Sequence, residues 1–162
     1  MLVRNVQPGI YVWNGDKSNK RGKEMNREDW KTYFMKIAEE VSTRATCDRL
    51  SVGCVLIKDN RIIATGFNGS ISGHEHCDEV GHLMHEGGCK RTIHAELNAL
   101  LQCARYGAAT SGATAYVTHY PCPDCMKALN QAGIKKVYYK HFYGHRYENN
   151  FDENMEVIQY GG

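Results

Sequence analysis

The sequence predicts an α/β fold, a three-layer α-β-α sandwich with a mixed sheet of about five strands. Segments of strand character alternate along the chain with segments whose apolar residues recur at helical spacing. Such alternation is typical of a sheet covered by helices on both faces. The 162 residues suffice for one domain with a full core.

The first predicted helix begins near Asn26, which we expect to cap it. Glu28 and Asp29 would then lie in the first turn, where the helix dipole favours acidic groups. Apolar side chains at helical spacing predict one buried face, made by Trp30, Tyr33, Phe34, Ile37, Ala38 and Val41.

A predicted hairpin follows, with strands at 52–57 and 61–67 joined by a turn at 58–60. A long polar loop comes next, and a loop of that length carries function or needs an internal staple. The predicted helix at 93–106 ends at Gly107 and buries Leu97, Leu100, Leu101 and Ala104. The remaining predictions are strands at 113–118 and 136–139, a helix at 123–132 and a short edge strand at 155–159.

Composition limits the function classes. No apolar run could span a bilayer and no signal peptide precedes the domain, so we expect a cytoplasmic protein without a membrane partner. The net charge of +2 lacks the basic excess of proteins that bind nucleic acids, so none is expected as a partner. Residues 1–24 are polar and aperiodic, which predicts a flexible N-terminal arm ahead of a catalytic domain at 25–162.

Two short motifs predict a catalytic zinc site. His94, Cys122 and Cys125 offer one imidazole and two thiolates, which leaves a fourth position for water. Glu96 is not needed as a ligand, so it can move protons. Each motif alone has plainer explanations, such as a redox pair or an ordinary helix start. Together they indicate a hydrolytic deaminase.

The chain resembles the zinc-dependent nucleoside and nucleotide deaminase superfamily, and within it the deoxycytidylate (dCMP) deaminases. The resemblance runs from about residue 25 to 140, in segments 44–53, 66–69, 91–99 and 116–122 as well as the zinc motifs. It implies hydrolysis of dCMP to dUMP and ammonia, in which zinc activates water and Glu96 transfers protons. Cytidine or deoxycytidine deaminase, tRNA adenosine deaminase and a catalytically inactive zinc-binding module are the alternatives.

The resemblance also implies roles for substrate-binding residues. Asn68 would meet the sugar 3′-hydroxyl, Arg49 and Ser51 would lie at the 5′-phosphate, and His119 and Tyr120 would line the pocket. The plainer interpretations are a turn asparagine, a solvated arginine and ordinary packing of the tyrosine. Three residues of a predicted helical segment after the fourth strand offer a second route to the phosphate, although surface charge is the simpler interpretation: His141, His145 and Arg146.

The resemblance further implies regulation and assembly. Many dCMP deaminases are hexamers that dCTP activates with magnesium and dTTP inhibits. Arg105 matches a position associated with that control, although a solvent-facing arginine would look the same. We therefore expect a homo-oligomer with possible dCTP and dTTP effectors.

The chain has seven cysteines, of which only Cys122 and Cys125 are assigned to the catalytic zinc. Their odd number and the absence of an export signal disfavour a disulfide framework. A second, structural zinc that staples the long loop is expected, as in some bacterial and phage dCMP deaminases, with ligands Cys47, Cys77, His82 and Cys89. His85 is the rival to His82, and free cysteines in a packed loop are the alternative. Cys54 and Cys103 are expected to be buried hydrophobic residues.

Overall fold

The computed structural model describes residues 27–142 and 151–161, so the predicted arm, Asn26, His145 and Arg146 lie outside the described residues. A five-stranded sheet has the order β2-β1-β5-β6-β7. Strand β1 (Gly53–Lys58) runs antiparallel to β2 (Arg61–Phe67) and to β5 (Thr114–His119). Strands β6 (Lys136–His141) and β7 (Glu156–Gln159) continue parallel to β5. The predicted mixed sheet is confirmed.

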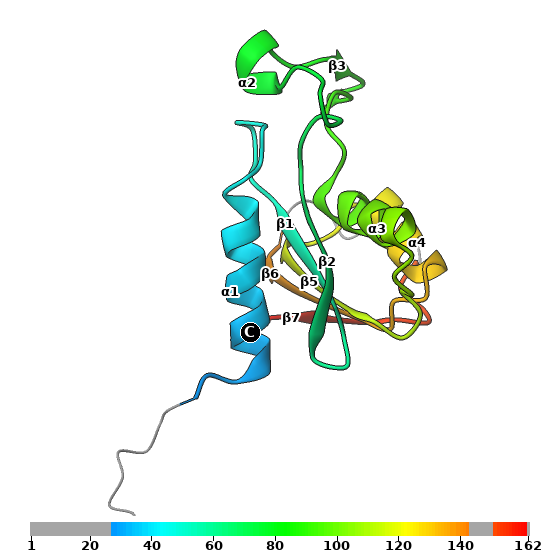
Figure 1. Cartoon of the computed structure of the whole chain (residues 1–162). Coiled ribbons are helices and arrows are strands. Elements are labelled where there is room, and N and C mark those ends of the chain that lie inside the picture. Colours follow the sequence, from blue (N-terminus) through cyan, green and yellow to red (C-terminus); the bar gives the residue numbers. More distant parts are fainter. Residues whose placement is uncertain (1–26, 143–150, 162) are drawn as a thin grey trace, which may run out of the picture.

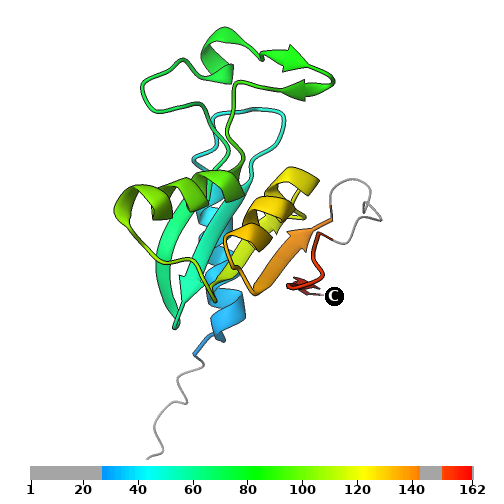
Figure 2. The same cartoon turned by 90° about the vertical axis from the view of Figure 1, so that its right-hand side faces the viewer.

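Helices cover both faces of this sheet. Helix α1 (Trp30–Ser42) lies on one face, and α3 (Ala95–Tyr106) and α4 (Pro123–Gln131) lie on the other (Figures 1 and 2). The predicted three-layer sandwich is therefore confirmed. Within the two described ranges, no helix combines the length and apolar character that a membrane crossing requires.

The long loop forms a small lobe of its own, residues 71–91, which stands away from the sandwich (Figures 1 and 2). It contains the short helix α2 (Cys77–Val80) and a two-stranded sheet of β3 (Met84–His85) and β4 (Gly88–Cys89). We call residues 71–91 the loop lobe. With so little regular structure to hold it, the loop lobe needs another source of order.

Helix α1 starts later than predicted. Asp29 caps it, since its Oδ1 accepts from the backbone N–H groups of Lys31 and Thr32 at 2.9 and 3.1 Å. The prediction of Asn26 as the cap is wrong, as is the burial of Trp30 and Tyr33, which are 55% and 44% exposed. Trp30 stacks on Phe34, and the buried face of the helix is narrower than the periodicity predicted, comprising Phe34, Met35 and Ala38.

Helix α3 packs on the sheet through small residues. Apart from Glu96, its buried side chains are Ala95, Ala99 and Cys103. The prediction that Leu97, Leu101 and Ala104 are buried is wrong, because all three are exposed. Leu100 packs partly buried against the core. Cys103 and Cys54 are buried in that core, as predicted. Because the side chains on this buried face are small, the helix can approach β2 closely.

Gly66 on β2 is required for that approach, and we expect Gly66→Ala to destabilise the fold by about 2–3 kcal/mol. A Cβ there would lie 2.2 Å from the carbonyl oxygen of Ala95 and 2.5 Å from the backbone nitrogen of Ala99, neither of which can rotate away. Urea denaturation measures the change. Gly88→Ala is the control, because its Cβ would meet nothing nearer than 3.8 Å. Equal stability of the two variants would contradict the close packing.

Candidate metal centre and active site

The first site forms where α3 and α4 begin. His94 and Cys122 occupy the N-cap positions of the two helices with extended backbone, and Cys125 lies in the first turn of α4. The His94 Nδ1 atom is 3.4 Å from Cys122 Sγ and 3.5 Å from Cys125 Sγ. A tetrahedral zinc with ordinary bond lengths separates a nitrogen and a sulfur ligand by about 3.5 Å. These residues fit zinc and leave the fourth position for water.

The electrostatics favour a metal at this point. A hydrogen bond from Cys125, supported by His94 and a backbone N–H, lowers the pKa of Cys122 to about 4. The hydrogen bond to Cys122 in turn raises the pKa of His94 above its ordinary value. A thiolate is thus already favoured at the helix N-terminus, and thiolates are the form of cysteine that binds metals.

Glu96 lies against the three ligands without belonging to them. Its side chain is 4% exposed, and burial raises its pKa above that of an ordinary glutamate. The neighbouring Glu96 carboxyl group contributes to raising the pKa of Cys125, which is consistent with a carboxyl group beside the metal position. A carboxyl group with a raised pKa is a stronger proton acceptor than an ordinary glutamate and can return the proton it takes up.

The sequence of this region has known relatives. The family described as the cytidine and deoxycytidylate deaminase zinc-binding region matches residues 28–141. The chain belongs to this deaminase family. The resemblance seen in the zinc motifs is therefore confirmed.

Two relatives and one solved structure illustrate the membership. The chain is 53% identical over 119 residues to ComE operon protein 2 of Bacillus subtilis, covering 74% of this chain but only 63% of that protein. It is 37% identical over 126 residues to the deoxycytidylate deaminase of Mycobacterium phage D29, covering 71% of this chain and 97% of that protein. The dCMP deaminase of cyanophage S-TIM5 in complex with dCMP and dUMP matches with a TM-score of 0.70 and 33% identity, over 83% of this chain and 98% of that one.

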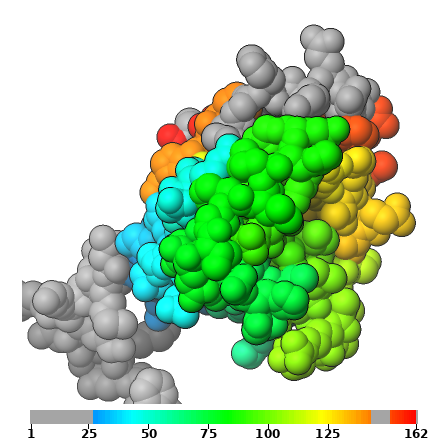
Figure 3. All heavy atoms as spheres, turned by 90° about the horizontal axis from the view of Figure 1, so that it is seen from above, coloured from blue at the N-terminus to red at the C-terminus, as the bar shows by residue number. Residues whose placement is uncertain are grey.

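A second cluster of metal-binding side chains lies where the loop lobe meets the segment after α1. Ligand atoms of Cys47, Cys77 and His82 gather within 4.8 Å of one another. Cys47 Sγ is 3.9 Å from His82 Nδ1, and Cys77 Sγ is 3.7 Å from Cys89 Sγ. Two thiolates on a tetrahedral zinc lie about 3.8 Å apart. Seen from above, the segment after α1 (cyan) lies against the loop lobe (green) (Figure 3).

The geometry distinguishes between the two candidate histidines. His82 directs Nδ1 toward the cysteines and places Nε2 2.9 Å from Asp48 Oδ1, the arrangement in which a carboxylate orients a metal-binding imidazole. His85 lies on the exposed hairpin, with Nε2 3.8 Å from Glu86. The structure brings His82, and not His85, to the cysteines. Sequence analysis missed Asp48, which carries no signal beyond its place beside Cys47.

Asn68 is buried and uses both ends of its amide within the chain. Its Oδ1 accepts from the backbone N–H of Val52, and its Nδ2 donates to the carbonyl oxygen of Leu50, both at 2.7 Å. These bonds clamp the segment that enters β1. The predicted contact of Asn68 with a sugar stays a prediction.

We expect Asn68→Ala to cost about 2–4 kcal/mol of folding free energy, because it leaves two backbone groups unpaired. Urea denaturation measures the loss. Asn154→Ala, at an exposed position, should remain within about 0.5 kcal/mol of the unsubstituted chain. A stable Asn68→Ala variant would show that the clamp contributes little.

The other predicted residues are more dispersed. Arg49 is exposed and directs Nη1 to Met84 Sδ of the loop lobe at 3.6 Å, while Ser51 is exposed just before β1. Arg105 stacks on the ring of Tyr106 at the end of α3 opposite to His94. Their roles at a phosphate and an effector stay predictions.

His119 and Tyr120 are close in sequence to the metal ligand Cys122. His119 ends β5, and Tyr120 donates its backbone N–H to the carbonyl oxygen of His141 at 2.8 Å. His141 ends strand β6, so the prediction that it belongs to a helix is wrong. Thr118, the strand residue before His119, is buried, and its hydroxyl lies 2.9 Å from His119 Nδ1.

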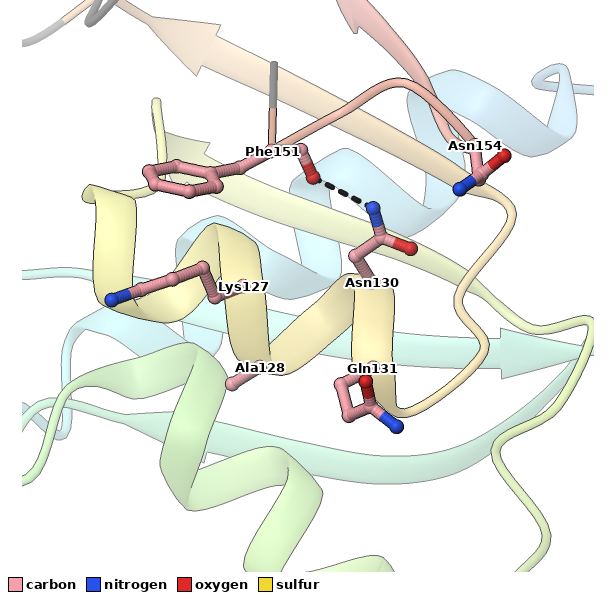
Figure 4. Close-up of a pocket in the computed structure, with 6 residues that line it drawn as sticks. All are labelled: Lys127, Ala128, Asn130, Gln131, Phe151 and Asn154. Atoms are coloured by element: carbon pink, nitrogen blue, oxygen red, sulfur yellow. Dashed lines mark hydrogen bonds between the residues drawn. The ribbon is translucent and has the colours of Figure 1, made fainter. Parts of the chain in front are cut away.

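A surface hollow on α4 does not belong to this site. It lies between α4 and the segment after residue 150, and Asn130 donates to the carbonyl oxygen of Phe151 within it (Figure 4). Lys127 extends over the Phe151 ring. Of the predicted site residues that the structure describes, none lines the hollow.

Proposed function

We propose that this chain is a zinc-dependent dCMP deaminase, which hydrolyses dCMP to dUMP and ammonia. The observation that carries the proposal is the set of three ligands at tetrahedral spacing beside buried Glu96. The phage D29 relative and the S-TIM5 structure, which was solved with dCMP and dUMP, support the substrate.

Each residue has a separable role in this reaction. Zinc, when bound, lowers the pKa of a coordinated water to near 7. Glu96 would take a proton from the attacking water and deliver it to N3 of the pyrimidine as the water oxygen bonds to C4. Glu96 then carries the second proton to the departing amino group, so that dCMP and water give dUMP and ammonia. The starts of α3 and α4 hold the ligands fixed throughout.

A second zinc in the loop lobe is part of the proposal. Cys47, Cys77, His82 and Cys89 supply three thiols and an imidazole, and Asp48 supports the histidine. Cysteine-rich sets closed by protein ligands are typical of structural zinc. Such an ion would supply the order that the small sheet of the loop lobe cannot.

Regulation, assembly and location follow from the family and are proposed with it. We assign Arg105 to a site for dCTP with magnesium, which would activate, and for dTTP, which would inhibit. A homo-oligomer in the cytoplasm is the proposed form. Adding either nucleotide to the assay, with Arg105→Ala as the comparison, tests this part separately.

The substrate is tested by ammonia release from dCMP, CMP, deoxycytidine, dCTP and tRNA. We expect dCMP to give the highest kcat/KM by a factor of at least ten. Preference for deoxycytidine would indicate a nucleoside deaminase, and preference for tRNA would indicate a tRNA deaminase. Either result would overturn the substrate assignment while leaving the zinc chemistry intact.

A further inference from the structure

Two histidines stand side by side at the carboxyl ends of the parallel strands β5 and β6. His119 and His141 are register partners, with ring centroids 5.1 Å apart and planes at 43°. Side chains alternate across a strand, so both histidines face the same side of the sheet as Val117 and Val137. Those valines belong to the core that packs against α3 and α4. The pair therefore faces the layer that carries the zinc ligands.

This edge of the sheet is the usual place for a ligand. In α/β sheets, ligands bind outside the carboxyl ends of parallel strands. His119 lies three residues before Cys122, so the pair borders the catalytic centre along the chain. The predicted phosphate residue Arg49 instead contacts Met84 in the loop lobe.

A chain of hydrogen bonds fixes the form of His119. The backbone N–H of Gly53 donates to Thr118 Oγ1 at 3.1 Å, and that oxygen lies 2.9 Å from His119 Nδ1. Thr118 is 3% exposed, so its own hydroxyl proton needs an acceptor inside the protein. Donation to Nδ1 satisfies it. In the neutral imidazole the ring proton is then on Nε2, which makes Nε2 the hydrogen-bond donor of the ring.

The electrostatics favour an anion as the ligand of His119 and His141. Burial, and then the neighbouring His141, lower the pKa of His119, since two imidazolium ions side by side repel each other. An anion placed between the rings would offset that repulsion and accept hydrogen bonds from both. The substrate proposed above carries one anionic group, its 5′-phosphate, which offers three acceptor oxygens.

We propose that His119 and His141 hold the 5′-phosphate of the nucleotide, and that Thr118 is a positioning residue that keeps the proton of His119 on Nε2. The proposal rests on the proposed function and extends it, because it names the groups that distinguish a nucleotide from a nucleoside. Neither histidine takes part in the proton transfers at the pyrimidine ring.

The test compares steady-state kinetics with dCMP and with deoxycytidine, which lacks the phosphate. We expect His141→Ala to raise KM for dCMP about tenfold or more, the cost of a lost charge-assisted hydrogen bond. Its kcat for dCMP and its kcat/KM for deoxycytidine should stay within about twofold. His85→Ala, at an exposed histidine of the loop lobe, is the control and should change neither substrate.

Thr118 is tested by the same comparison. Thr118→Val should raise KM for dCMP several-fold with little effect on deoxycytidine, and Thr118→Ser, which keeps the hydroxyl, should restore it. Deoxycytidine turnover reports whether each variant folds with an intact zinc centre.

An unchanged KM for dCMP in His141→Ala would overturn the phosphate subsite, as would equal losses for dCMP and deoxycytidine. Thr118→Val and Thr118→Ser variants that bind dCMP equally well would overturn the positioning role. Should the unsubstituted chain deaminate deoxycytidine as efficiently as dCMP, the proposed function itself would fail and the subsite with it.

Discussion

Glu96→Gln should reduce kcat for dCMP by a factor of about 10³ or more while leaving zinc content and fold unchanged. The amide has nearly the same shape as the carboxyl group but cannot accept a proton, and general acid–base groups contribute about 10²–10⁴ in rate. Glu96 is buried, and an amide of nearly the same size keeps the packing around it. Steady-state kinetics and metal analysis on the same preparation measure both effects.

The control for this experiment is Glu86→Gln in the exposed hairpin of the loop lobe, which should keep full activity. Activity of Glu96→Gln within tenfold of the unsubstituted chain would contradict the role given to Glu96. A loss of zinc in that variant would instead assign Glu96 to the metal ligands.

Cys77→Ser should lower the zinc content from about two to about one ion per chain and destabilise the loop lobe by several kcal/mol. Zinc binding by a closed cysteine-rich site supplies folding free energy directly. Cys77 is buried, and its sulfur lies 3.7 Å from that of Cys89, so serine there leaves a hydroxyl among the remaining ligands. Metal analysis and hydrogen exchange over residues 71–91 measure the two effects.

Asp48→Asn tests the second zinc site with a smaller change than the loss of a ligand. It keeps all four ligands but weakens the support of His82 Nε2, and losses of such partners cost about 10–100-fold in metal affinity. His85→Ala should retain both ions. A single zinc per chain before any substitution would exclude the second site.

Part of the candidate metal centre could be predicted from the sequence because its geometry is local. Cys122 and Cys125 are three residues apart at a helix start, so any helix there brings their sulfurs together. His94 opens the other helix for a comparable reason, since its backbone precedes the first turn. Alternation of strands and helices likewise predicted the layers of the fold.

Contacts between distant segments could not be predicted in this way. The hydroxyl of Thr118 accepts from Gly53, 65 residues away, and Asp48 meets His82 across the base of the loop lobe. Helical periodicity also identified an apolar stripe on α1 but not how much of it the sheet covers, so Trp30 was wrongly expected in the core. Such contacts depend on tertiary packing, and local sequence patterns do not show which distant segments pack together.

The central claim, hydrolytic deamination of dCMP, is tested most directly by running the reaction in ¹⁸O-labelled water. The proposed chemistry bonds a water oxygen to C4 as ammonia leaves. Mass spectrometry should therefore find one ¹⁸O on C4 of the uracil base of dUMP, with one ammonia released for each dUMP formed. No dUMP from the zinc-loaded chain, or dUMP without the label, would contradict the account.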